Sequence, residues 1–122
     1  MKTKEIGVLI GKLVSFRDAL KLHHWHVTGS GSYATHMALD EAIEDINDPI
    51  DSLAETAYAV YGDIEVVVPE TKNPSNIISF AEDFYKYLGE SRKLGTEDFQ
   101  NGIFDELQQS IQQLLYRLKR LK

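Results

Sequence analysis

The sequence predicts an all-α fold, a four-helix bundle, from three observations. Apolar residues recur at three- and four-residue steps in four separate stretches, glycines lie between these stretches, and a proline-containing segment without helical period divides the second stretch from the third. This spacing places the apolar side chains of each helix on one face, so that the four faces can bury one another. A chain of 122 residues has the size of one domain, and we expect a single bundle domain over residues 1–122.

The first helix is expected over about residues 3–28, because one apolar stripe runs through that range. The members of this stripe are Ile6, Leu9, Leu13, Phe16, Leu20, His24 and Val27. The glycine-rich stretch 28–32 should end this helix, and it supplies Ser32 as the expected N-cap of the next one.

The second helix is expected from Tyr33 to Tyr61, with Gly62 directly after it. The residues of its expected inward stripe are His36, Asp40, Ile43, Asn47, Ile50, Asp51, Ala54 and Tyr58. Half of this stripe is polar, and unpaired charges rarely enter a core, so something must compensate for them. Pro49 removes one backbone hydrogen bond and should kink this helix or divide it in two.

The segment 62–75 contains two prolines and a β-branched run, and we expect it to be an extended connection. It reaches at most about 46 to 50 Å, whereas a helix of about 25 residues is roughly 37 Å long. The third helix can therefore run parallel to the second. A third helix from Ile77 to near Gly95, and a fourth with a coiled-coil-like apolar seam that begins at Phe104, complete the pattern. Together these four helices and the extended connection predict a ferritin-like four-helix bundle with a long crossover between helices 2 and 3.

Composition limits the classes of function. The chain has no cysteine, so a bound metal would be held by histidine, carboxylate or water. The formal net charge of -6 disfavours DNA binding, which depends on lysine and arginine neutralising phosphates. No apolar run approaches the roughly 20 residues that cross a bilayer, so we expect a cytoplasmic protein without a membrane partner.

Two histidines and three carboxylates are the candidate metal ligands, namely His24, His36, Asp40, Asp51 and Glu55. His24 lies about four residues before the expected turn and His36 about four after it, so an antiparallel hairpin puts both imidazoles at a similar height. Each carboxylate pair with a four-residue spacing shares one helix face. Nitrogen and oxygen ligands of this mix suit Fe(II), Mn(II) or Zn(II). The alternatives are a packed core histidine at His24 and a solvated acidic face at Asp51 and Glu55.

The spacing also divides the candidates into two groups. Asp51 follows Asp40 by eleven residues, which is a rise of about 16 Å along a helix, whereas metal–ligand bonds are near 2 Å. One ion cannot bind both carboxylates within one chain. Either the two groups are separate, or a two-fold axis brings Asp51 and Glu55 of one subunit to the histidine group of another.

The run His24-Trp25-x-Val27-x-Gly29, followed by His36-x-x-x-Asp40 and Asp51-x-x-x-Glu55, resembles the ferroxidase signature of Dps, the starvation-induced mini-ferritins. The resemblance implies that these five ligands bind iron across a subunit two-fold. It also implies oxidation of Fe(II) by hydrogen peroxide or oxygen, for iron detoxification or storage. The expected assembly is a homo-oligomer, a two-fold dimer at least, with a twelve-subunit cage as the larger alternative. Zinc and manganese are the alternative metals.

Two other functions fit the same pattern. One is a non-enzymatic helical oligomer in which the ligands hold a structural metal such as zinc. The other is a metal-free interaction bundle that uses the apolar seam of the fourth helix as its contact surface. Aerobic addition of Fe(II) separates the ferroxidase from both, because only the ferroxidase would produce ferric absorbance.

Overall fold

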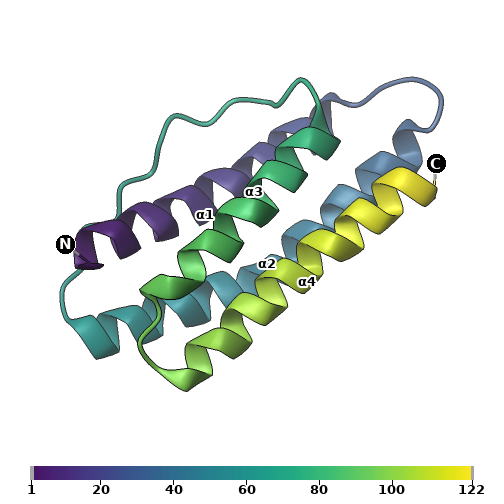
Figure 1. The fold of residues 1–122 in the computed structure, drawn as a ribbon. Helices are drawn as coiled ribbons and strands as arrows, with labels where there is room; N and C mark the ends of the chain where they lie inside the picture. The colour runs from purple at the N-terminus through teal and green to yellow at the C-terminus, as the bar shows by residue number, and fades with distance from the viewer. Residues whose placement is uncertain (1, 122) are drawn as a thin grey trace.

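The computed structural model describes residues 2–121, and these residues form four α-helices (Figure 1). The helices are α1 (Lys2–His26), α2 (Ser32–Tyr61), α3 (Ile77–Ser91) and α4 (Asp98–Arg120), with a short 3-10 helix η1 (Arg92–Leu94) after α3. No strand occurs in this described part of the chain. The prediction of an all-α chain with four helices is confirmed. Between residues 2 and 121, no helix combines the length and the apolar character needed to cross a membrane.

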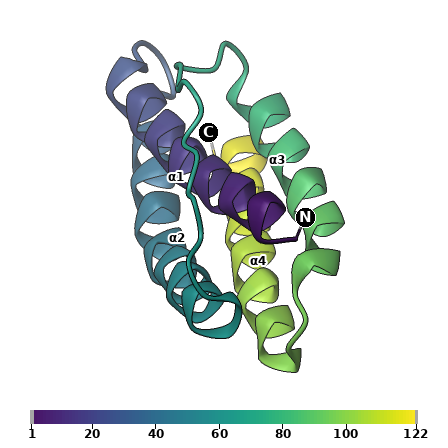
Figure 2. The same ribbon diagram turned by 90° about the vertical axis from the view of Figure 1, so that its left-hand side faces the viewer.

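The helices surround one core, in which α2 packs on both α1 and α4, and α4 packs on α3 (Figures 1 and 2). The contact between α1 and α3 is sparse by comparison. Phe16 of α1 bridges that side, because its ring stacks on Phe84 with a centroid distance of 4.2 Å and on Phe80 with a centroid distance of 5.3 Å. The largest fully buried side chains are Phe104, Leu9, Leu13, Leu20, Leu39, Ile46, Leu88, Leu107, Ile111 and Leu114.

The buried face of α2 differs from the predicted one. The residues that it buries are Ala38, Leu39, Ala42, Ile46, Pro49, Ile50, Leu53 and Ala57. Of the expected inward stripe only Ile50 is fully buried, whereas Asp40, Asn47 and Asp51 are exposed. The helix is turned so that the aliphatic residues beside the polar ones enter the core, which avoids the cost of burying unpaired carboxylates. The prediction of a half-polar inward stripe is therefore wrong for the single chain.

Two local expectations for α2 are also wrong, namely the N-cap at Ser32 and a division of the helix at Pro49. Its first residue is Ser32, and the N-cap is Gly31, which adopts a left-handed conformation with φ of 79°. This glycine carries the sharp turn that Ser32 could not adopt as readily. Pro49 lies buried inside a helix that continues on both sides of it. Packing of the neighbouring aliphatic side chains keeps the helix in one piece, although an interior proline costs about 3 kcal/mol.

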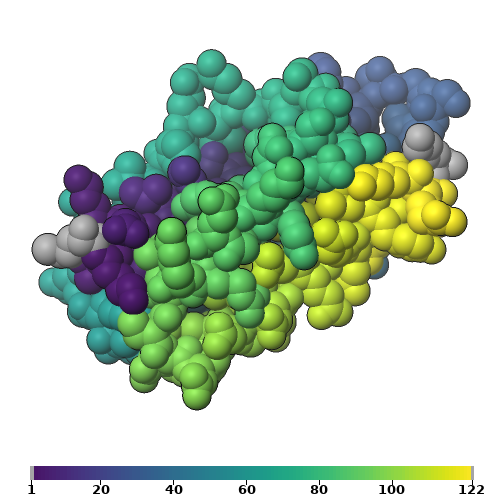
Figure 3. Space-filling model, in the orientation of Figure 1, coloured from purple at the N-terminus to yellow at the C-terminus, as the bar shows by residue number. Residues whose placement is uncertain are grey.

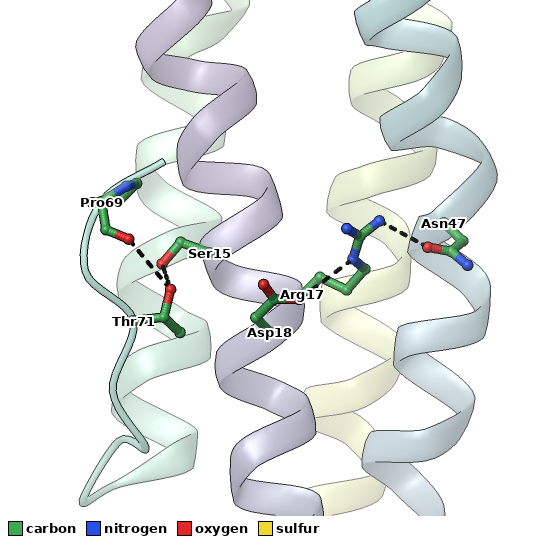
Figure 4. A network of polar contacts seen from close by, with 6 residues as sticks. All are labelled: Ser15, Arg17, Asp18, Asn47, Pro69 and Thr71. Carbon is green, nitrogen blue, oxygen red and sulfur yellow. Dashed lines mark hydrogen bonds and ion pairs between the residues drawn. The ribbon is translucent and has the colours of Figure 1, made fainter. Parts of the chain in front are cut away.

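Residues 62–76, which we call the connector, lie along α1 (Figures 1 and 2). The Val67 N–H donates to the carbonyl of Gly7 at 3.4 Å, near the start of α1. Further along, the hydroxyls of Ser15 and Thr71 are hydrogen bonded at 2.7 Å (Figure 4). Near the end of α1, His23 Nδ1 and Asn73 Oδ1 lie 2.7 Å apart.

Gly7 and Gly11 explain how the connector lies so close to α1. A Cβ at Gly7 would overlap the carbonyl oxygen of Glu65, and a Cβ at Gly11 would overlap the carbonyl oxygen of Val67. The two glycines are four residues apart and therefore share one face of the helix. Their missing side chains leave two notches, which receive alternate carbonyl groups of the connector.

Candidate metal-binding site

His24 and His36 come together at the end of the bundle where α1 joins α2. Their rings stack with centroids 3.6 Å apart and an angle of 23° between the planes. Nδ1 of His36 lies 2.9 Å from the backbone carbonyl oxygen of His24. A carbonyl only accepts, so Nδ1 carries the proton and Nε2 of a neutral His36 keeps its lone pair. Such a backbone contact orients a metal-ligating histidine and sets its tautomer.

Asp40 completes this group, one turn after His36. Its Oδ1 lies 3.6 Å from Nε2 of His24 and 3.9 Å from Nζ of Lys21. The carboxylate is about half exposed, whereas His24 is buried. A buried imidazole of α1 and a half-exposed carboxylate of α2 thus lie side by side.

His24 is the most unusual member of the group, because it is 6% exposed and neither of its ring nitrogens has a hydrogen-bond partner among the described residues. Burial lowers the pKa of His24 below its ordinary value of 6.5, the charges of His36 and Lys21 lower it further, and Asp40 opposes them. The imidazole is therefore held neutral, which is the form that binds metals. Leaving a buried polar group unsatisfied costs about 1 to 3 kcal/mol, and a ligand bound at these nitrogens would offset that cost.

Asp51 and Glu55 do not join this group within one chain. Both are exposed on α2, beyond Asn47. Between residues 2 and 121, no three histidine, aspartate or glutamate side chains converge closely enough to hold a metal ion. His24 contacts His36 on one side and Asp40 on the other, while the other two predicted ligands lie farther along α2. The division follows the rise of the helix, about 16 Å over eleven residues.

The exposed side of α2 carries a polar stripe, which we define as Asp40, Asn47, Asp51 and Glu55. Nη1 of Arg17 donates to Oδ1 of Asn47 at 3.0 Å and so links α1 to the middle of this stripe (Figure 4). The guanidinium therefore lies between the two groups of candidate ligands. Its positive charge suits a surface that has a carboxylate on either side.

Sequence reasoning missed two basic residues of this region, Arg17 and Lys21. Nζ of Lys21 lies 5.8 Å from the ring centroid of Trp25 and within 4 Å of Asp40, so it neutralises part of the site's acidic charge. For Lys21 the signal in the sequence was its position three residues before His24, which puts Lys21 and His24 on one side of α1. Three large exposed side chains, Trp25, Tyr33 and Met37, lie next to the histidines in sequence.

In the comparison with protein families, the model of a family of unknown function, DUF5856, matches residues 24–118. The chain belongs to DUF5856. No curated protein and no solved structure matches the chain. The range matched by DUF5856 contains all five candidate ligands and the whole connector. Its description names no activity, so the chemistry of the site has to be argued from the residues.

We expect His24→Leu to stabilise the metal-free protein by about 1 kcal/mol, because leucine removes a buried imidazole whose nitrogens are unsatisfied. The same change should abolish metal binding at this site. Urea unfolding in the presence of a chelator measures the first effect, and titration with Zn(II) or Fe(II) measures the second. His26→Leu is the matched control, since His26 is exposed on the same turn. A loss of stability in His24→Leu, with metal affinity unchanged, would contradict a ligand role for His24.

Proposed function

We propose that this chain is a Dps-like mini-ferritin subunit that binds Fe(II) as its substrate and oxidises it at a site shared between two subunits. The observation that carries the proposal is the buried His24, whose two ring nitrogens have no hydrogen-bond partner among the described residues. It is stacked on His36, whose Nε2 is left free by the contact of Nδ1 with the His24 carbonyl. Unpaired imidazole nitrogens beside a carboxylate are suitable ligands for Fe(II).

The division of the ligands supports a shared site. His24, His36 and Asp40 supply two nitrogens and a carboxylate, which is an incomplete shell for iron. Asp51 and Glu55 of the partner subunit would add the missing oxygen ligands, and their exposure leaves them free to do so. A two-fold interface provides two such composite sites per dimer, each with residues from both chains.

The ferritin-like arrangement of the four helices, with a long crossover between α2 and α3, is part of this proposal. Contacts of the connector with Gly7, Ser15 and His23 support it, since they follow α1 from its first turns to its last. In bundles of this type, metal sites are built from side chains of facing helices. His24 of α1 and His36 of α2 are such a pair.

The proposed reaction transfers electrons from iron to an oxidant and needs few protein groups. Two Fe(II) ions each give up one electron, and hydrogen peroxide accepts both, with cleavage of its O–O bond to two hydroxide ions. Oxygen is the alternative oxidant. The side chains bind and orient the iron, and carboxylates partly offset the added charge of Fe(III). Lys21 lies within 4 Å of Asp40 and would give way to the cation that replaces it.

Aerobic addition of Fe(II) to chelator-treated protein tests the proposal. We expect ferric absorbance to develop faster than in protein-free buffer, and to fall to the rate of the buffer in His24→Ala/His36→Ala. The matched control is His23→Ala/His26→Ala, which removes two nearby histidines outside the candidate site and should retain the wild-type rate. Wild-type protein that is folded but no faster than buffer would reject ferroxidase activity. Tight Zn(II) binding in that case would favour the structural-metal alternative.

A further inference from the structure

The connector contains an extended run of β-branched residues, of which Val66 packs against the core and Val67 and Val68 are open to solvent. Residues 62–74 form neither helix nor turn, and Ile64 is buried among core residues. Val67 is 51% exposed and Val68 is 50% exposed. In the space-filling view the connector, coloured teal, stands at the surface above α1 (Figure 3). Such residues favour extended backbone, and large apolar ones exposed together are a common mark of a contact surface.

One edge of this run faces α1. The carbonyls of Glu65 and Val67 occupy the notches at Gly7 and Gly11, and the Val67 N–H donates to the carbonyl of Gly7. In an extended chain, the N–H and C=O of one residue point to the same side, and those of the next residue point to the opposite side. Residues 65 and 67 therefore direct their backbone groups at the helix.

The other edge carries the backbone groups of Val66 and Val68, which point away from α1. Within residues 2–121, no backbone or side-chain hydrogen bond uses the N–H or C=O of either residue. Only the carbonyl of Ile64 has a partner on that side, because it accepts from the hydroxyl of Tyr58 at 2.8 Å. A row of unpaired N–H and C=O groups on extended backbone is a template for pairing with another strand.

We propose that this edge pairs antiparallel with the same edge of a second copy of the chain. Val66 of one copy lies opposite Val68 of the other, and the two Val67 residues lie opposite each other. The two outward-facing residues of each copy then form hydrogen-bonded pairs, and the Val67 residues form the non-hydrogen-bonded pair between them. The result is a short two-stranded ribbon across a two-fold axis.

Two features favour this register, namely the positions of the carboxylates and the backbone carbonyl that already accepts a hydrogen bond within the chain. With the Val67 residues opposed, Glu65 faces Pro69 and Glu70 faces Ile64, so no two carboxylates are directly opposite. A register centred on Val66 would instead need the Ile64 carbonyl, which already accepts from Tyr58. The valine run is thus complementary to itself, which favours a second copy over an unrelated peptide. The pairing uses none of the five candidate metal ligands and can be tested separately from iron oxidation.

Single cysteine variants test the register, because the chain has no cysteine of its own. In Val67→Cys, the two introduced thiols should lie on Cα atoms about 4.5 Å apart, within the range that a disulfide spans. In the control Glu65→Cys the corresponding positions are offset by four residues, about 13 Å along the strand. We expect Val67→Cys to form a disulfide-linked dimer at least tenfold faster than Glu65→Cys under mild oxidation.

Hydrogen exchange on the wild-type chain gives a second test that needs no substitution. The amides of Val66 and Val68 should be protected, and their protection should increase with protein concentration. Equal rates of disulfide formation at positions 65 and 67 would overturn the proposed register. Unprotected Val66 and Val68 amides in a wild-type sample that native mass spectrometry shows to be monomeric would overturn the pairing itself. Failure of iron oxidation alone leaves both results unaffected.

Discussion

Replacing Gly11 by alanine is expected to lower the free energy of unfolding by about 2 kcal/mol, because overpacking against fixed neighbours costs about 1 to 3 kcal/mol. The added Cβ would overlap the carbonyl oxygen of Val67 and lie 3.0 Å from the backbone nitrogen of Val68. These atoms belong to backbone and cannot rotate away as a side chain would. The connector must shift, and its contacts with α1 weaken with it.

The sign of this effect makes the prediction specific. Alanine is the better helix former by about 1 kcal/mol, so a glycine in a helix without close neighbours should gain stability on the same substitution. Gly102 of α4 is that control, since a Cβ built there meets nothing within 4 Å. Urea unfolding followed by circular dichroism should place Gly11→Ala below the wild type and Gly102→Ala above it. Equal shifts in the two variants would show that the connector does not press on α1.

Gly11 also illustrates which parts of the fold can be predicted from the sequence. The helices follow from local periodicity, so their existence and approximate ends could be predicted. The apolar stripe of α1 was correct from Ile6 to His24, although Val27 lies beyond the helix end, and the seam predicted to begin at Phe104 is buried at Phe104, Leu107 and Leu114. The need for glycine in the middle of α1 could not be predicted, because it depends on a segment more than fifty residues away in the sequence.

The face of α2 was harder to predict for a related reason. Its polar and aliphatic stripes lie side by side, and the four-residue spacing of the candidate ligands indicated the polar stripe as the inward face. In the single chain the aliphatic stripe enters the core, because leucine and isoleucine gain from burial whereas an unpaired aspartate loses. The polar stripe then faces solvent, where only a second molecule could cover it.

The candidate site, too, could be predicted from the sequence only in part. The approach of His24 to His36 could be predicted, because both lie about four residues from a turn whose glycines allow a tight reversal. The unsatisfied nitrogens of His24 could not, since they depend on which polar groups of the folded chain come within reach. The role of Asp51 and Glu55 stays a prediction, because it depends on a neighbouring subunit.

Mixing two inactive variants is expected to restore iron oxidation if the site is shared. His24→Ala/His36→Ala lacks one half-site, and Asp51→Ala/Glu55→Ala lacks the other. In a heterodimer both lesions fall into one composite site, which leaves the second site with wild-type residues throughout. Random exchange makes half of the dimers mixed, each with one of two sites intact, so about a quarter of the wild-type rate should return.

The control for this experiment is a mixture of His24→Ala with His36→Ala. Both lesions then lie in the same half-site, every composite site keeps one of them, and no recovery is expected however completely the subunits exchange. Native mass spectrometry establishes exchange independently of activity in the first mixture, because its two variants differ in mass. His24→Ala and His36→Ala have the same mass, so one of them is labelled with nitrogen-15 in the control mixture. If the first mixture exchanges fully and remains as inactive as its parents, the shared site is wrong. Asp51 and Glu55 would then be surface carboxylates, and the iron ligands would have to be sought around His24, His36 and Asp40 within a single chain.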